Sequence, residues 1–232
     1  MIGSKANARI TGVLFILGTV PPMLASVFWG RSLASPGYLT EMAAHPVEIL
    51  GTALFALFMG LACAGIGLSL YPVLKRHGEG QALAAAGFRV MEGTIQIVSA
   101  ISIIALLALS REFVKAGSPP DSFFQPLAAA VKAVREWVLN GAFLLPWCVG
   151  AFIYYRIFFT TRLVPRWLSV WGIVGLALML AGAFTGMFGV LDSFSAGQFF
   201  FMMPILIQEM VLAFWLIVKG YSEEGAPHDN SL

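Results

Sequence analysis

Residues 49–74 read ILGTALFALFMGLACAGIGLSLYPVL, a stretch of 26 positions without a charged side chain. As an α-helix with a rise of 1.5 Å per residue, this stretch would be about 39 Å long. The hydrocarbon core of a bilayer is only about 30 Å thick. Apolar residues occupy all sides of such a helix, which is typical of a segment surrounded by lipid or by other helices. The stretch therefore predicts a helix that spans a membrane.

The composition of the whole chain agrees with a membrane environment. Of the 232 residues, 59% are hydrophobic and 11% are charged, and the mean hydropathy is +0.84. A soluble domain has about 25% charged residues, so the 14 basic and 12 acidic side chains could not cover a soluble fold of this size. These values exclude a secreted disulfide scaffold, a nucleic-acid-binding protein and a disordered chain. We expect an all-α, polytopic bundle of transmembrane helices whose main partner is the lipid bilayer.

The charged residues mark where the spans end. Four further uncharged stretches of 18 to 25 positions lie between charged residues, and each is long enough for a span. The last part of the chain has 26 positions interrupted by one carboxylate, so a sixth helix requires Glu209 to lie inside the membrane. We expect six spans near 9–29, 47–74, 82–110, 137–161, 166–190 and 195–219, in a single domain over 1–221, with an amphipathic outer segment over 123–136 and a polar cytoplasmic tail over 222–232.

The basic residues of the connections set the predicted orientation. With six spans, eight Lys and Arg residues fall on one side of the membrane and five on the other. The side richer in positive charge is the cytoplasmic one, so we expect both termini there. The first apolar run continues from Arg9 through Trp29, which is longer than the apolar region of a signal peptide, and we expect it to stay in the protein as the first helix. Cys63 and Cys148 lie within apolar runs and are expected to be free thiols.

Glu209 is the strongest single candidate for a functional residue. It precedes Lys219 by ten residues, or about 15 Å along a helix, so it lies near the middle of the bilayer. An ionised carboxylate is costly there and is rarely kept without a role or a partner. The alternative is a glutamate that holds helices together by hydrogen bonds, helped by the neighbouring Gln208.

Arg89 and Glu92 form a second candidate group on the predicted third helix. Their spacing of three residues places them on one face. If the span begins after Glu92, then Arg89 reaches the cytoplasmic interface and only anchors the helix. If residues 83–88 also lie in the membrane, both charges are buried near the depth of Glu209, and Gln96 and Asn140 extend the polar cluster.

No motif of a known catalytic or cofactor site is present. The sequence has no Gly-x-Ser-x-Gly, no His-Glu-x-x-His and no glycine-rich phosphate loop. His45 and Glu48 have the spacing of a pair of metal ligands, but zinc sites use three or four protein ligands. We therefore expect no cofactor, no metal and no catalytic residue, and we interpret His45 and Glu48 as helix-capping groups in a wet outer vestibule.

Small residues at a spacing of four recur on the predicted helices. Examples are Gly60-x-x-x-Ala64 and Gly182-x-x-x-Gly186. Such faces are typical of helices in close contact, and they also allow oligomerisation.

Four motifs, spread over almost the whole chain, resemble one known family. They are ARITG at 8–12, FRVME at 88–92, LVPRWL at 163–168, and EMVLAFWLIVKG at 209–220. In these motifs the chain is similar to a family of bacterial inner-membrane proteins catalogued only as a domain of unknown function. The resemblance implies a multi-pass protein of the bacterial plasma membrane, and it implies no activity.

The polar residues support two functions of different classes. The first is the binding or transport of a small molecule or ion at a polar midplane site built from Glu209, Glu92 and Arg89. The second is a regulatory or scaffold role without transport, in which the buried charges only fasten helices. If Arg89 pairs with Glu92 and leaves Glu209 without a cation, the carrier is favoured. If Arg89 pairs with Glu209 instead, the pair is structural.

Overall fold

The computed structural model describes residues 5–29, 35–188, 190 and 196–222. The described residues form helices and connections, without a strand. The long helices are α1 (Lys5–Trp29), α4 (Pro46–Leu74), α5 (Glu79–Lys115), α7 (Leu144–Thr161), α8 (Arg166–Met187) and α9 (Ala196–Val218); the shorter ones are α3 (Tyr38–Ala44), the 3₁₀ turn η1 (Lys75–His77), α6 (Phe124–Trp137) and the π-helix η2 (Val138–Ala142).

Five of the helical segments in the described part of the chain are long and apolar enough to cross a bilayer. They are Pro46–His77, Glu79–Lys115, Leu144–Thr161, Arg166–Met187 and Phe199–Val218. The last of these contains Glu209, so that carboxylate lies within an apolar helix of sufficient length. The first helix, α1, has 25 residues but is not among the five. An all-helical, multi-pass membrane protein is therefore supported, whereas the count of six spans stays a prediction.

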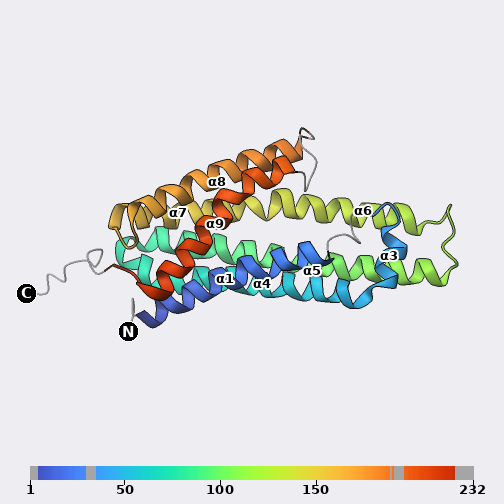
Figure 1. The fold of residues 1–232 in the computed structure, drawn as a ribbon, viewed down its shortest axis with the longest axis horizontal. Helices are drawn as coiled ribbons and strands as arrows, with labels where there is room; N and C mark the ends of the chain where they lie inside the picture. Colours follow the sequence, from blue (N-terminus) through green and yellow to red (C-terminus); the bar gives the residue numbers. More distant parts are fainter. Residues whose placement is uncertain (1–4, 30–34, 189, 191–195, 223–232) are drawn as a thin grey trace, which may run out of the picture.

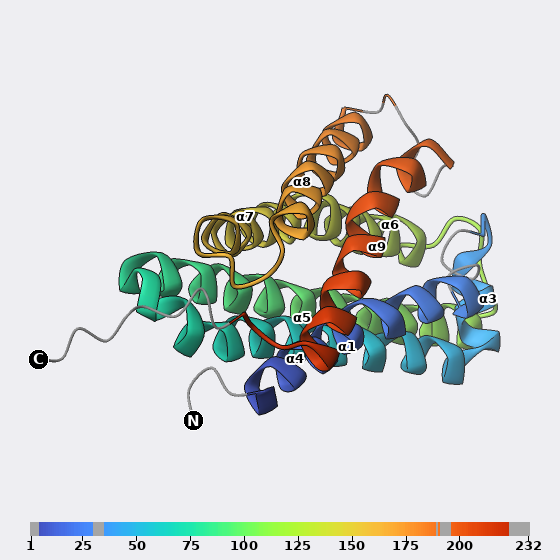
Figure 2. The same ribbon diagram turned by 60° about the vertical axis from the view of Figure 1, so that its left-hand side comes forward.

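The helices pack as an elongated bundle. The helices α4 and α5 lie antiparallel along its length, and α1 packs against α4 and α9 (Figure 1). On the opposite side of α5 lies α7, and α8 and α9 form a hairpin that rises away from the α4–α5 pair (Figure 2). The main core fills the space between these helices and includes Phe15, Leu70, Tyr154, Leu168 and Leu212.

One end of the bundle collects basic residues. At this end α1 begins, η1 joins α4 to α5, α7 connects to α8, and α9 ends (Figure 1). We call it the basic end. The residues that the sequence analysis assigned to the cytoplasmic side belong to these segments: Lys5, Arg9, Lys75, Arg76, Arg156, Arg162, Arg166 and Lys219.

The other end of the bundle extends beyond the length of a simple span. The helix α5 has 37 residues and is therefore about 55 Å long. Its last turns pack with α3, the start of α4 and α6 (Figure 1), around a second core that includes Met42, Ile49, Leu106 and Phe113. The helix therefore continues on both sides of 82–110, the range near which the third span is predicted, and the bounds of the span itself stay a prediction. The helix α5 does not end at Arg111, because its later turns pack against the second core through Phe113.

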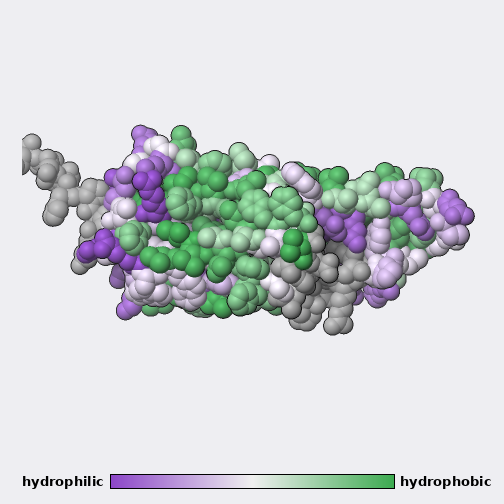
Figure 3. Space-filling model, turned by 90° about the horizontal axis from the view of Figure 1, so that it is seen from above, coloured by the Kyte–Doolittle hydropathy of each residue, from purple (hydrophilic) through white to green (hydrophobic). Residues whose placement is uncertain are grey.

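The surface of the bundle carries an apolar band. Seen from above, hydrophobic residues cover the middle of the molecule, and hydrophilic residues gather toward its two ends (Figure 3). Large apolar side chains are exposed on this band, for example Leu61, Leu68, Ile101 and Phe214. Soluble monomers rarely expose a contiguous apolar surface of this kind, so the band is typical of a surface that contacts lipid.

Candidate functional site: a buried polar centre

The helix α5 presents a line of polar side chains to the interior of the bundle. Arg89, Glu92, Gln96 and Ser99 follow one another at spacings of three or four residues, which places them on one face of the helix. All four are buried. The apolar side chains of Val90, Met91, Val98 and Ile101 are exposed on the surface of the bundle. The helix therefore turns its polar face inward and its apolar face outward, as helices of membrane proteins do.

Arg89 and Glu92 form an ion pair inside the bundle. The Arg89 Nη1 and Glu92 Oε2 atoms lie 2.9 Å apart, and the two side chains are only 2% and 1% exposed. The alternative in which Arg89 reaches the interface as an anchor is therefore wrong. The side chain is surrounded by helices on both sides: α4 approaches through Gly67, where an added Cβ would lie 2.8 Å from the Cβ of Arg89.

Glu209 faces the same interior from α9. Its carboxylate accepts a hydrogen bond of 3.0 Å from the Thr19 hydroxyl of α1, and the side chain of Trp147 is a further polar neighbour. Glu209 also interacts electrostatically with Arg89. Among the described residues the ion pairs are Arg89–Glu92 and two pairs outside the core, so Glu209 is in none of them.

Gln208 has a different environment from Glu209, although the two are adjacent in the chain. Its amide oxygen accepts a hydrogen bond of 2.5 Å from the Tyr155 hydroxyl. Its amide nitrogen donates to the Leu168 carbonyl at 3.0 Å. Since these bonds join α9 to α7 and α8, Gln208 fastens three helices together and is not part of the group around Arg89.

Several buried polar atoms of the centre have no hydrogen-bond partner. They are Arg89 Nε, Gln96 Oε1 and Ser99 Oγ. The Tyr154 hydroxyl is a hydrogen-bonding neighbour of the Tyr155 hydroxyl. A buried polar group without a partner is costly and is uncommon in native structures. We use the name buried polar centre for the six residues Arg89, Glu92, Gln96, Ser99, Tyr154 and Glu209. Asn140, which the sequence analysis added to the cluster, lies in the π-helix η2, and its side chain is outside the described part of the structure.

Some members of the site could not be found from the sequence. Thr19 and Tyr154 lie in apolar runs, where a threonine or a tyrosine gives no signal distinct from ordinary helix packing. Cys63 of α4 is a hydrogen-bonding neighbour of Glu92, although a buried cysteine is normally a small apolar residue. Both cysteines are free and buried, as predicted.

His45 and Glu48, the two residues with the spacing of metal ligands, lie close to each other. His45 Nδ1 lies 3.4 Å from Glu48 Oε1, and both side chains are substantially exposed. Within the described residues, no group of three or more His, Cys, Asp or Glu side chains is placed to hold a metal ion. His45 directly precedes α4 and follows α3, so it stands between two helices at the end opposite to the basic end.

Two small-residue positions are used within the chain. A Cβ added at Gly60 would lie 2.7 Å from the Gly93 carbonyl oxygen, and one added at Gly182 would lie 2.5 Å from the Phe201 Cβ. The backbones of α4 and α5 therefore meet at Gly93, the residue after Glu92, and α8 approaches α9 closely at Gly182. The contact between Gly60 and Gly93 fixes which side of α5 faces α4, and the adjacent Glu92 is directed into the bundle.

Two pockets in the described part of the chain lie outside the centre. One is at the basic end, between the α7–α8 connection and the end of α9. The other is a shallow apolar groove between α4 and α5. Neither is lined by a residue of the buried polar centre.

Comparison with known proteins gives one match. The model of the family described as Domain of unknown function (DUF4386) matches residues 10–220. No curated protein and no solved structure matches the chain. The match runs from α1 to the end of α9 and confirms the resemblance that the four sequence motifs indicated.

Proposed function

The chain belongs to the DUF4386 family of domains of unknown function, and we propose that it binds and transports a small ion or molecule through its buried polar centre. Five long apolar helices in the described part of the chain support a multi-pass membrane protein. The carrier function is the proposal, and the location in a bacterial plasma membrane, with six spans and both termini in the cytoplasm, is proposed with it.

One observation carries the proposal: the single guanidinium of the centre is paired with Glu92, while Glu209 is held by a neutral hydroxyl. With both carboxylates ionised, the centre has one negative charge more than it has positive charges. A proton or a monovalent cation would neutralise it. Intramembrane carboxylates with this kind of imbalance are typical of proton relays and ion pathways.

The polar groups without partners support the binding of a ligand. Arg89 Nε is a donor, Gln96 Oε1 is an acceptor, and the Ser99 hydroxyl can act as either. A small polar molecule with complementary groups would satisfy them. Their burial would make each hydrogen bond strong, since water competes little there.

The orientation is supported by the charge distribution. The basic end contains eight Lys and Arg residues in short connections and helix ends, and such residues concentrate on the cytoplasmic side. The span count of six is supported by α1, which has 25 residues and packs against α4 and α9.

A second function, a regulatory or scaffold protein without transport, is favoured by a different observation. The bundle around the centre is closely packed at Gly60 and Gly93, and the two pockets described above do not reach the centre. In that case the Arg89–Glu92 pair would only hold α5 in place.

Charge displacement in reconstituted liposomes distinguishes the two functions. The purified protein is reconstituted, the liposomes are adsorbed on a solid-supported electrode, and the external pH or the Na⁺ concentration is changed in a step. We expect a transient current in the wild type, because a cation enters the field of the membrane when it reaches Glu209. The variant Glu209→Gln removes the charge with little change of shape and should abolish the current.

The matched control is Glu112→Gln, which removes a carboxylate from an exposed ion pair at the far end of α5. This variant should keep the current. Wild-type liposomes that respond no more than protein-free liposomes, or a Glu209→Gln variant with an unchanged current, would exclude the carrier and leave the scaffold function.

A further inference from the structure

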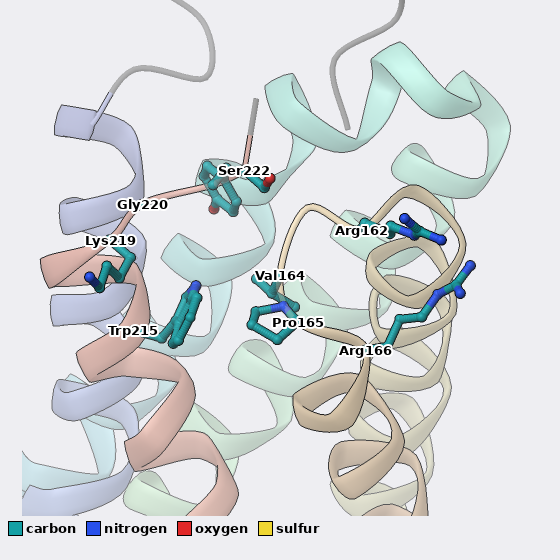
Figure 4. A pocket seen from close by; sticks show the side chains of 9 residues that line it. Arg162, Val164, Pro165, Arg166, Trp215, Lys219, Gly220 and Ser222 are labelled. Atoms are coloured by element: carbon teal, nitrogen blue, oxygen red, sulfur yellow. The ribbon is translucent and has the colours of Figure 1, made fainter. Parts of the chain in front are cut away.

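A pocket of about 460 Å³ opens at the basic end of the bundle. It lies between the connection from α7 to α8 on one side and the end of α9 on the other (Figure 4). Arg162 and Arg166 belong to the first side, and Trp215 and Lys219 to the second. The proposed function does not use this pocket.

The pocket is strongly basic. Three of its lining residues, Arg162, Arg166 and Lys219, are cationic, and none of the lining residues that the structure describes, which end at Ser222, is acidic. In the view of Figure 4 the side chains of Arg162 and Arg166 extend to the same side, away from Trp215, while Lys219 lies on the opposite side of the pocket.

Arg166 is held in place by its own helix hairpin. Its Nε donates a hydrogen bond of 3.3 Å to the Phe159 carbonyl, and its guanidinium lies 5.2 Å from the centre of the Phe159 ring. These contacts leave the terminal nitrogens of the guanidinium for another partner. Arg162 ends α7 in the left-handed conformation, with φ at 57°, a conformation that is uncommon for residues other than glycine.

The walls of the pocket are apolar and aromatic. Val164, Pro165 and Trp215 line it between the cationic residues. Tyr221 also lines it and donates a hydrogen bond of 3.2 Å to Thr11. Burial raises the pKa of Tyr221, so its phenol stays neutral and adds no negative charge. The pocket thus offers apolar walls with positive charge at the rim.

We propose that this pocket binds a phosphate group, and that the source of this group is an anionic phospholipid of the adjacent leaflet. A guanidinium binds phosphate through two parallel N–H···O bonds, which gives both affinity and orientation. Basic pockets between transmembrane helices at the cytoplasmic side are typical binding sites for anionic lipid headgroups. Arg162 and Arg166, whose side chains extend to the same side, would bind the phosphate. Pro165 would contact the glycerol region, and Lys219 on the opposite side would add positive charge to the rim.

The test is native mass spectrometry of the purified protein with added lipid. Phosphatidylglycerol is compared with phosphatidylcholine, and inorganic phosphate is added in a separate arm. We expect the wild type to retain one phosphatidylglycerol and to retain phosphatidylcholine far less. Since one basic residue near an anionic lipid contributes about a fivefold gain in affinity, the double variant Arg162→Gln/Arg166→Gln should bind roughly 25-fold more weakly.

The matched control is Arg9→Gln/Lys75→Gln, which removes two charges from the same end but outside the pocket. It should bind phosphatidylglycerol as the wild type does. If the double pocket variant does not fold, Lys219→Gln alters an exposed side chain on the other rim and should weaken binding about fivefold.

The outcomes separate the two sources of phosphate. Retention of phosphatidylglycerol that depends on the pocket residues supports the lipid. Binding of inorganic phosphate that depends on the same residues, without a preference for phosphatidylglycerol, supports a phosphate site that is filled from solution. Equal losses in the pocket variant and in the control variant, or retention that neither variant changes, would overturn the proposal, because the charge would then act without a defined site.

Discussion

Two ion pairs on the same helix allow the energetic role of burial to be tested directly. Arg89–Glu92 and Lys115–Glu112 both have a spacing of three residues on α5, with N–O distances of 2.9 Å and 2.7 Å. The first pair is buried, whereas the side chains of the second are 71% and 57% exposed. The perturbation is the same in each case, a glutamate replaced by glutamine.

The expected costs differ because of the surroundings. Opposite unit charges about 4 Å apart attract by roughly 4 kcal/mol at an effective dielectric constant of about 20. Removing one partner of a buried pair costs about 3–5 kcal/mol, since the other charge is left without compensation. For Glu92→Gln we therefore expect a destabilisation of about 3–5 kcal/mol. For Glu112→Gln we expect about 0–1 kcal/mol, which is the usual value for an exposed pair.

Glu209→Gln is the third variant of this set. It leaves the Arg89–Glu92 pair intact, and the amide oxygen can still accept the hydrogen bond from Thr19. The hydrogen bond itself contributes about 0.5–1.5 kcal/mol. We therefore expect Glu209→Gln to change the stability by less than about 1 kcal/mol.

The two buried cysteines supply the assay. Cys63 and Cys148 are free thiols inside the bundle, so a maleimide dye that becomes fluorescent on reaction should label them only when the protein unfolds. A change of 1 kcal/mol shifts the melting temperature of a chain of this length by about 2–4 °C. Glu92→Gln should thus lower the midpoint by roughly 6–20 °C, and the other two variants by a few degrees at most.

A specific result would refute this reasoning. If Glu209→Gln lowers the midpoint as much as Glu92→Gln, then Arg89 is shared between both carboxylates, and the uneven charge distribution behind the carrier proposal is wrong. The double variant Arg89→Met/Glu92→Met provides a further check. It removes both charges and should be more stable than Glu92→Gln alone, because no unpaired charge remains.

Three further predictions concern packing, accessibility and topology. Gly93→Ala should destabilise the protein by about 1–3 kcal/mol, because its Cβ would lie 2.4 Å from the Gly60 carbonyl oxygen. Gly87→Ala on the same helix meets nothing within 4 Å and should be neutral or slightly stabilising. Thermal unfolding in detergent compares the two variants, and equal losses of stability would contradict the close contact. In the folded protein Cys63 and Cys148 should resist a small maleimide, which mass spectrometry measures, and rapid labelling would contradict their burial. A C-terminal fluorescent reporter that requires the cytoplasm should be active, and activity of a periplasmic reporter at the same position would reverse the proposed orientation.

The fold class could be predicted from the sequence alone. The lack of charge over 49–74, 167–191 and similar stretches decides that these segments are apolar helices, because the transfer of an uncharged helix into lipid depends on its own residues and little on its neighbours. Glu209 could also be recognised from the sequence as a candidate functional residue. A single carboxylate within an apolar span is costly whichever way the helix faces.

The partners of the buried polar residues were decided by the tertiary structure. Glu209 and Thr19 are 190 positions apart, and nothing in either local sequence selects the other. Their contact depends on the rotation of α1 and α9 and on their order in the bundle. The burial of Arg89 likewise depends on the close approach of α4 at Gly67, and an isolated α5 would allow the same side chain to reach the interface. A one-dimensional pattern determines which segments enter the membrane, because hydrophobic transfer is a sum over residues, whereas the pairing of charges depends on distances between helices that only packing sets.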